Sequence, residues 1–164
     1  MRQRIRRFFF PTITAWYLIR VCLVALFAYV FFGYLCTPFV IRGSSMEPTY
    51  SDGGFNFCWR PNTFFFGPKR YQVVVVRMAG EQVMLLKRVV AMEGDEVEFH
   101  QGRLVVNGEE IVEPYLRTPC NWNLPPRRVD ERHVYLVGDN RGMPMDHHVF
   151  GQAHVYRIAG SPLW

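Results

Sequence analysis

A serine and a lysine in this chain have the side chains of a nucleophile and a general base. Ser45 lies in the turn-like stretch 43–49, and Lys87 lies in the apolar stretch 85–90. A serine hydroxyl attacks a carbonyl at neutral pH only when a nearby group takes its proton. A lysine can take it when neutral, and burial among apolar side chains favours the neutral form. If the fold brings the two side chains together, they indicate hydrolase chemistry.

The sequence around Lys87 predicts a β-strand that carries the lysine on an apolar face. Alternation along a strand places Lys87 on one face with Val83, Leu85, Val89 and Ala91, and Arg88 on the other with Met84, Leu86 and Val90. Taken alone, each residue has an ordinary explanation. A serine beside glycine and before proline is typical of a turn, and a lysine in a strand often extends to solvent. The pair becomes informative only in its order behind an apolar segment.

The length and composition describe one folded domain with an attachment element. The chain has 164 residues, of which 49% are hydrophobic, 16% aromatic and 20% charged, so it is not a disordered chain. The net charge is +5, but five of the basic residues lie in the first twenty positions: Arg2, Arg4, Arg6, Arg7 and Arg20. No signature of a nucleic-acid-binding module accompanies the charge, so we expect no nucleic-acid partner.

Residues 21–41 carry no charge and predict a transmembrane helix that ends near Pro38. The run is too long for a cleavable signal peptide and lacks a small-residue cleavage site, which favours a retained anchor in membrane lipid. By the positive-inside rule, the basic N-terminus is expected in the cytoplasm. The predicted organisation is a cytoplasmic and interfacial segment 1–20, an anchor 21–38 and an extracytoplasmic domain 39–164.

The cysteines and histidines do not predict a metal site. No Cys-x-x-Cys spacing occurs, and the adjacent His147 and His148 should diverge on an extended segment, which favours a surface position. In an oxidising compartment Cys58 and Cys120 could form a disulfide, or both could remain buried thiols. Both alternatives stay open.

Strand signals dominate after residue 41, and no amphipathic helix is predicted there. Strands are expected at 55–59, 72–78, 82–92, 96–100, 103–106, 133–137 and 153–159. Hairpin turns are expected at Gln101-Gly102 and Asn107-Gly108. The stretch 113–128, rich in proline and arginine, predicts a surface excursion. The fold class is therefore mostly β, on one N-terminal transmembrane helix.

Three short motifs follow the apolar segment in order. They are Ser-Met-Glu-Pro-Thr at 45–49, Lys-Arg-Val-Val-Ala at 87–91 with Gly-Asp at 94–95, and Gly-Asp-Asn-Arg at 138–141 before Asp146 and Phe-Gly at 150–151. With Val-Asn-Gly-Glu at 106–109 and Glu-Pro-Tyr at 113–115, they resemble the bacterial type I signal peptidases. These are membrane-bound serine/lysine proteases that remove signal peptides from exported proteins. The resemblance implies a β domain of antiparallel sheets that form a partly closed barrel.

The resemblance also assigns roles to the motif residues by position. It makes Ser45 the attacking residue and Lys87 the general base. Arg88, Asp139 and Asp146 would support the site. No metal or cofactor is required for this chemistry.

Further expectations concern the oxyanion and the substrate. The Ser45 N–H would stabilise the oxyanion, and Gly43 stands where many relatives have a second, hydroxyl donor, which leaves the Ser44 hydroxyl to assist. Signal-peptide-bearing preproteins would bind in extended form, with small side chains in pockets lined by Phe39 and Ile41. The membrane implied is the bacterial inner (plasma) membrane, with the mitochondrial inner membrane as the second choice.

The last motif departs from the family pattern. Pro144 replaces a serine whose hydroxyl orients the lysine in bacterial relatives, and proline has neither a side-chain hydroxyl nor an N–H. His147 and His148 replace the usual Ser-Arg pair. Asp146 therefore lacks its usual arginine, and Arg88 and Arg141 are its candidate partners.

Three alternatives to a serine/lysine signal peptidase follow from the same residues. Asp146 and His147 could form a triad with the serine, since triads occur in any chain order. The departures could instead mark a degenerate, membrane-tethered β domain that binds exported chains or a partner. Self-cleaving repressors share the serine/lysine pair, but their DNA-binding module does not precede it here.

Overall fold

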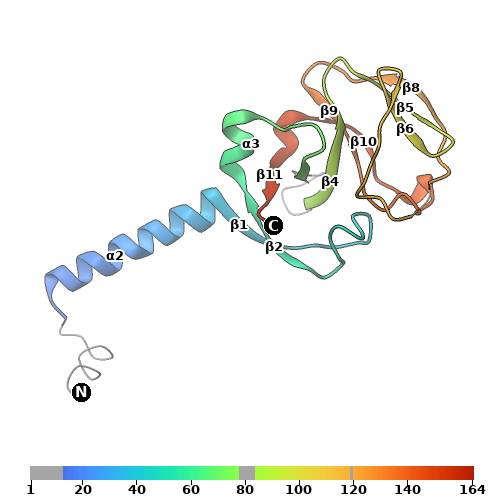
Figure 1. The fold of residues 1–164 in the computed structure, drawn as a ribbon. Helices are drawn as coiled ribbons and strands as arrows, with labels where there is room; N and C mark the ends of the chain where they lie inside the picture. The colour runs from blue at the N-terminus through green and yellow to red at the C-terminus, as the bar shows by residue number, and fades with distance from the viewer. Residues whose placement is uncertain (1–12, 78–83, 119) are drawn as a thin grey trace.

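A long apolar helix leads into the β domain. The computed structural model describes residues 13–77, 84–118 and 120–164. Helix α2 (Ala15–Val30) begins at Thr14, whose side chain accepts a hydrogen bond from the Tyr17 N–H at 3.3 Å, and it continues as a π-helix, η1 (Phe31–Leu35). It projects away from the domain and buries no side chain (Figure 1). Its 21 residues, Ala15–Leu35, are long and apolar enough to cross a bilayer core, which needs about 20 residues.

The helix begins and ends earlier than the apolar run predicts. The helix was expected to end near Pro38, but Cys36–Val40 form strand β1 and Pro38 lies inside this strand. Pairing with the domain, Cys36 opposite Trp59 and Val40 opposite Phe55, ends the helix at Leu35. Proline is tolerated there because β1 is an edge strand, where an N–H is not required on the open side.

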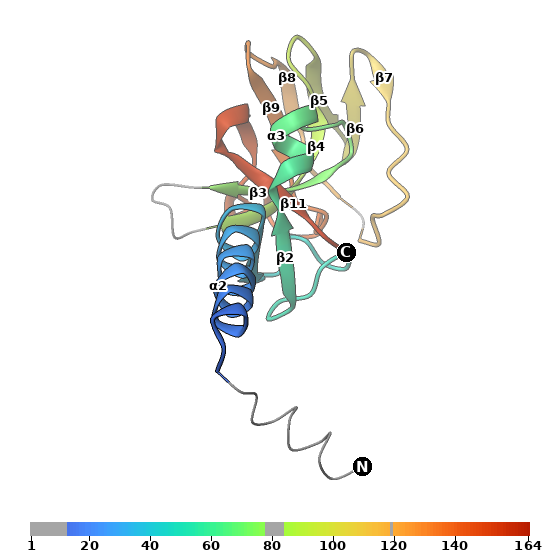
Figure 2. The same ribbon diagram turned by 90° about the vertical axis from the view of Figure 1, so that its left-hand side faces the viewer.

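The remaining strands form two antiparallel sheets. The larger has the order β1-β2-β11-β3-β4-β9-β10, with β2 (Phe55–Trp59), β11 (Ile158–Pro162), β3 (Val73–Arg77), β4 (Met84–Ala91), β9 (His133–Val137) and β10 (Gly151–His154). The smaller has the order β7-β6-β5-β8, with β7 (Glu109–Glu110), β6 (Arg103–Val106), β5 (Glu96–His100) and β8 (Leu124–Arg128). It lies at the end of the domain away from α2 (Figure 2). The predicted fold class is confirmed.

Most predicted strands are present with small changes of boundary. The strands at 55–59, 96–100, 103–106 and 133–137 have the predicted limits, and 72–78 and 82–92 correspond to β3 and β4 within the described residues. Residues 78, 82 and 83 of those predictions lie outside the described residues. Both hairpin predictions are confirmed, because Gln101, Gly102, Asn107 and Gly108 all have positive φ.

One strand prediction and part of the predicted surface excursion were wrong. The stretch 153–159 does not form one strand, because a 3₁₀ turn, η3 (Val155–Arg157), separates β10 from β11. The end of the predicted surface excursion forms β8, which pairs with β5. A short helix, α3 (Arg60–Phe66), follows β2. Phe64, Phe65 and Phe66 are all exposed in it, so it has no amphipathic periodicity for sequence reasoning to detect.

The hydrophobic core lies on both sides of β4. Val90 and Ala91 pack in a cluster with Phe99, Leu104 and Trp122, which joins the two sheets. Leu86 packs in another cluster with Ile41, Met46, Cys58 and Val75. The strand that carries Lys87 is therefore buried along most of its length. Cys58 and Cys120 are thiols and form no disulfide, and burial raises the pKa of Cys58 to about 11.

Candidate active site

The structure brings the predicted nucleophile and base into hydrogen-bonding contact. Lys87 Nζ donates to Ser45 Oγ at 2.8 Å, across 42 positions of sequence. Lys87 is only 4% exposed. It lies in the middle of β4, where it is opposite Val74 of β3. The serine hydroxyl therefore has a buried amine as its immediate neighbour, as nucleophilic catalysis requires.

The loop that carries Ser45 is anchored on both sides of the serine. The side chain of Met46 is buried in the cluster with Ile41, Val75 and Leu86. The backbone N–H of Asn140 donates to the Ser45 carbonyl at 3.0 Å, and Asn140 Nδ2 donates to the Ser44 carbonyl at 3.0 Å. These bonds fix the serine against the Gly-Asp-Asn-Arg motif.

Gly138 is required at the start of that motif by close approach of two backbones. A Cβ atom at this position would lie 2.2 Å from the Ser45 carbonyl oxygen and 2.6 Å from His148 Nε2. Any larger residue would push the serine loop away from β4. The glycine therefore contributes to the distance between Ser45 and Lys87.

Burial shifts the titration of Lys87 toward the neutral amine. Loss of water contact lowers the pKa of Lys87 to about 8, although the negative charge of Asp139 acts in the opposite direction. A pKa near 8 leaves about a tenth of the lysine neutral at pH 7, far more than for an exposed lysine with its pKa of about 10.4. Within the described residues, Ser45 Oγ is the hydrogen-bond partner found for Nζ.

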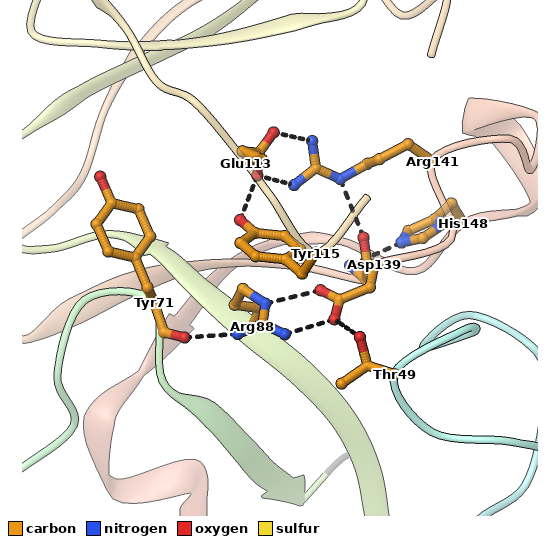
Figure 3. Close-up of polar contacts among 9 residues, drawn as sticks. Thr49, Tyr71, Arg88, Glu113, Tyr115, Asp139, Arg141 and His148 are labelled. Atoms are coloured by element: carbon orange, nitrogen blue, oxygen red, sulfur yellow. Dashed lines mark hydrogen bonds and ion pairs between the residues drawn. The ribbon is translucent and has the colours of Figure 1, made fainter. Parts of the chain in front are cut away.

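Arg88, the residue after the lysine, makes a buried ion pair with Asp139. Arg88 Nε donates to Asp139 Oδ1 at 2.8 Å and Nη2 donates to Oδ2 at 2.6 Å (Figure 3). The Thr49 hydroxyl also donates to Asp139 Oδ2 at 2.5 Å, and Arg88 Nη1 donates to the Tyr71 carbonyl at 2.8 Å. The carboxylate is therefore neutralised beside the lysine and ties the serine loop, through Thr49, to β4.

A second buried ion pair lies next to the first. Arg141 donates to Glu113 through Nη1 at 2.7 Å and Nη2 at 2.5 Å, and its Nε donates to the Gly138 carbonyl at 3.0 Å. The Tyr115 hydroxyl donates to the same Glu113 carboxylate (Figure 3). The guanidinium carbon of Arg88 lies 3.9 Å from the centre of the Tyr115 ring, a cation–π contact that joins the two pairs.

Glu113 and Tyr115 are site-supporting residues that sequence reasoning missed. They lie in the stretch assigned to a surface excursion, yet the Glu113 side chain is only 4% exposed. In the sequence, the Glu-Pro-Tyr string indicates only a resemblance to the bacterial family members. This string was the sequence feature that could have indicated their role, because the glutamate and the tyrosine carry polar groups that need hydrogen-bond partners when buried.

His148 is buried, so its predicted surface position was wrong. Its Nε2 accepts a hydrogen bond from the Gly138 N–H at 2.9 Å, and its ring packs edge-on against Trp122 with the ring centres 4.8 Å apart. Burial, with the positive charges of Lys87 and Arg141, lowers the pKa of His148 to about 3, so the imidazole stays neutral. His147 beside it is exposed.

Asp146 is not part of the buried site. It lies in a 3₁₀ turn, η2 (Met145–His147), with its side chain 79% exposed. The predicted partners Arg88 and Arg141 pair with Asp139 and Glu113 instead. Both arginines are buried, whereas the Asp146 carboxylate lies at the surface, 3.8 Å from His147 Nε2.

The predicted oxyanion donors differ in their surroundings. The Gly43 N–H donates to Asp52 Oδ1 at 2.8 Å, and Gly43 has a positive φ of 89° that a side chain would strain. The Ser44 hydroxyl lies 3.8 Å from the Met143 sulfur and donates to it. The Ser45 N–H donates to no acceptor within the described part of the chain, which leaves it available to a ligand.

Phe39 and Ile41 line a cavity at the serine. The cavity, about 10 Å³, is bordered by both residues and by Ser45, Met84 and Leu86. It shares Phe39 and Leu85 with a larger groove of about 560 Å³ between β1 and the start of β4, which Val40 also borders. The smaller space holds about one water-sized group, so only a short side chain can enter beside the serine.

The comparisons with known proteins identify the family. The model of "Signal peptidase, peptidase S26" matches residues 13–163. The chain belongs to this signal peptidase family. It is 28% identical to a signal peptidase I from Bacillus licheniformis, over 78% of this chain and 75% of that protein. It is 30% identical to a probable signal peptidase I-1 from Synechocystis, over 80% of this chain and 71% of that protein.

Among solved structures, a signal peptidase I from Enterococcus faecalis superposes with a TM-score of 0.46 and 22% sequence identity, covering 57% of this chain and 95% of that one. The family membership confirms the resemblance based on the three motifs. With its apolar N-terminal helix, the chain is a membrane-anchored signal peptidase of the serine endopeptidase class.

The buried Arg88–Asp139 pair should matter to stability far more than a surface pair does. Replacing Arg88→Met leaves the Asp139 carboxylate buried and unpaired, so we expect a loss of about 3–5 kcal/mol in the free energy of unfolding. Arg103→Met, the same substitution at the exposed pair with Glu110, should cost at most about 1 kcal/mol. Denaturant titration of both variants in one detergent measures the difference. Equal losses would contradict a structural role for the buried pair.

Proposed function

We propose that this protein removes N-terminal signal peptides from exported preproteins, with Ser45 as nucleophile and Lys87 as general base. The observation that carries the proposal is the 2.8 Å contact between Ser45 Oγ and a lysine that is 4% exposed. An active dyad needs both proximity and a lowered lysine pKa, and this site combines them. Burying an amine costs free energy, and a domain that only binds other chains gains nothing from an amine buried at this distance from a serine.

Acylation uses the two side chains in sequence. The neutral Lys87 amine takes the Ser45 hydroxyl proton while Oγ bonds to the scissile carbonyl carbon. The carbonyl oxygen becomes negative and accepts a hydrogen bond from the Ser45 N–H. When the C–N bond breaks, the Lys87 ammonium returns the proton to the leaving amine, and the signal peptide remains as an ester on Ser45.

Deacylation repeats these steps with water as the nucleophile. Lys87, neutral again, takes a proton from water as its oxygen attacks the ester carbonyl. The proton then passes to Ser45 Oγ as the ester bond breaks, which releases the signal peptide with a free carboxyl end. Asp139, although close enough to favour the charged lysine, has its own charge balanced by Arg88.

The groove beside β1 supports an extended substrate. β1 is an edge strand of the larger sheet, so one of its sides can pair with an added chain. The cavity of about 10 Å³ at Phe39, Ile41 and Ser45 admits only a small side chain, as signal peptides of the Ala-x-Ala kind supply before the cleaved bond. Larger side chains have the groove of about 560 Å³ available farther along β1.

The proposed orientation follows the charge distribution. The arginines at positions 2, 4, 6 and 7, which lie outside the described residues, favour a cytoplasmic N-terminus. The catalytic domain would then lie outside the cytoplasm, where exported chains emerge from the membrane. The bacterial inner (plasma) membrane is the proposed location.

Substitutions at the dyad and at His147 separate the two possible bases. We expect Ser45→Ala and Lys87→Ala each to reduce cleavage of a purified preprotein at least about a thousandfold, as removal of a member of such a unit does. His147→Ala should cleave at the parental rate, because its imidazole is exposed. Product formation is measured on gels with proteins reconstituted in detergent. Full activity of Lys87→Ala would exclude the dyad, and equal product from Ser45→Ala would exclude the peptidase function.

The pH dependence reports the ionisation of the base. Because only neutral Lys87 accepts the serine proton, kcat/KM should rise about tenfold per pH unit below the lysine pKa and level off above about 8. The measurement is initial cleavage rates at low substrate from pH 6 to 10, with His147→Ala as the control. A plateau that begins near pH 6.5 and is lost in His147→Ala would instead point to a histidine base.

A further inference from the structure

A large apolar groove lies where the membrane helix meets the domain. Its volume is about 970 Å³, and it shares no lining residue with the cavity at Ser45. Tyr34 and Leu35, at the end of the apolar helix, line one side, and Phe64 and Phe65 of α3 line another. β3 and β11 contribute Arg77 and Ile158 to its floor.

The groove must lie at the level of the lipid headgroups. Residues Ala15–Leu35 rise about 32 Å as a helix, close to the thickness of a bilayer core, so Tyr34 and Leu35 mark the plane where the chain leaves the lipid. α3 packs beside this end of the helix (Figure 1). This holds for either orientation of the helix in the membrane.

The rim of the groove is unusually apolar for a water-facing surface. Phe64 and Phe65, which line the groove, are 82% and 72% exposed, and Phe66 beside them in sequence is 73% exposed. Three adjacent exposed phenylalanines expose apolar area that proteins normally cover, and contact with a membrane is one way to cover it. Phe64 and Phe65 line the same groove as Leu35, at the end of the membrane helix, so membrane lipid is the apolar phase nearest to them.

Two arginines give the same groove a positive charge. Arg60 and Arg77 both line it, and neither forms an ion pair with an acidic side chain of the described residues. The Nε atom of each is buried and has no hydrogen-bond partner there, and neither has the buried Thr63 hydroxyl. The two side chains line the same groove, so both charges face the space that a ligand would occupy. Buried guanidinium N–H groups without an acceptor cost free energy, and a bound anion would satisfy them by accepting charge-assisted hydrogen bonds.

We propose that this groove binds one anionic glycerophospholipid. Its phosphodiester accepts hydrogen bonds from Arg60 and Arg77, since guanidinium groups bind phosphate oxygens in pairs. Its acyl chains lie along Leu35, Phe64 and Phe65. Because Arg77 ends β3, the strand paired with the lysine strand β4, the lipid would hold the site-bearing sheet at a fixed height above the membrane.

The test measures thermal unfolding of the full chain in a neutral detergent. Dioctanoyl phosphatidylglycerol should raise the midpoint, whereas dioctanoyl phosphatidylcholine and inorganic phosphate should each raise it much less. The double variant Arg60→Gln/Arg77→Gln should need at least about tenfold more phosphatidylglycerol for the same shift, because charge-assisted hydrogen bonds are lost. Arg127→Gln/Arg128→Gln, two exposed arginines of β8, is the matched control and should respond like the parent.

A second variant covers the case in which the arginine variant does not fold. Phe64→Ser/Phe65→Ser alters only exposed side chains and should weaken the response to phosphatidylglycerol without creating a response to phosphate. The proposal is overturned if both lipids stabilise equally, if phosphate alone stabilises as well as the lipid, or if the β8 control loses the shift. These readouts do not involve cleavage, so they stand whether or not the proposed peptidase activity is found.

Discussion

A lysine that must be neutral, yet lies next to a carboxylate, is the constraint on which the rest of the site depends. Burial lowers the pKa of Lys87, and the negative charge of Asp139 raises it. Burial is the larger of the two effects, so the pKa of Lys87 stays below its ordinary value. Arg88 holds both oxygens of Asp139, so the lysine meets an ion pair rather than a bare anion. Adjacent residues of one strand thus supply the base and the guanidinium group that pairs with the neighbouring carboxylate.

The same ion pair belongs to a set of contacts that joins the late motif to the serine loop. Asp139 accepts from Thr49, and the next residue, Asn140, bonds to the carbonyls of Ser44 and Ser45. Gly138, one residue earlier, is held by His148. Each contact uses the backbone or a short side chain, which leaves little freedom for the distance between Oγ and Nζ. The geometry is preorganised by the fold, without a contribution from the substrate.

Sequence reasoning was strongest where the signal is local. The strands at 96–100 and 103–106 follow from alternation and from a turn in which Gln101 and Gly102 adopt positive φ. The helix end could not be predicted in this way. Cys36–Val40 continue the uncharged run of the helix, and only their pairing with β2, fifteen or more residues later, makes them a strand. The break between β10 and β11 likewise depends on which neighbour each half pairs with.

The residues of the site differ in the same way in how well the sequence predicts them. Ser45 and Lys87 could be chosen because their motifs are ordered and chemically specific. The supporting residues could not, since a charged residue's partner is fixed by tertiary structure. Asp146 and Glu113 are both carboxylates near a proline, and nothing in their local sequence says that Glu113 becomes buried against Arg141 while Asp146 faces solvent.

The orientation of Lys87 without the family's serine hydroxyl has a packing explanation. Pro144 is exposed and supplies no donor or acceptor to Nζ. The cavity of about 100 Å³ beside the lysine is lined mainly by apolar side chains, among them Val76, Leu136 and Phe150. The amine therefore has apolar side chains on one side and Ser45 Oγ at 2.8 Å on the other. A buried amine is stabilised by a hydrogen bond, so it is oriented toward the serine. The fold therefore holds the amine against Ser45 by packing, in place of the hydrogen bond that the family's serine hydroxyl supplies.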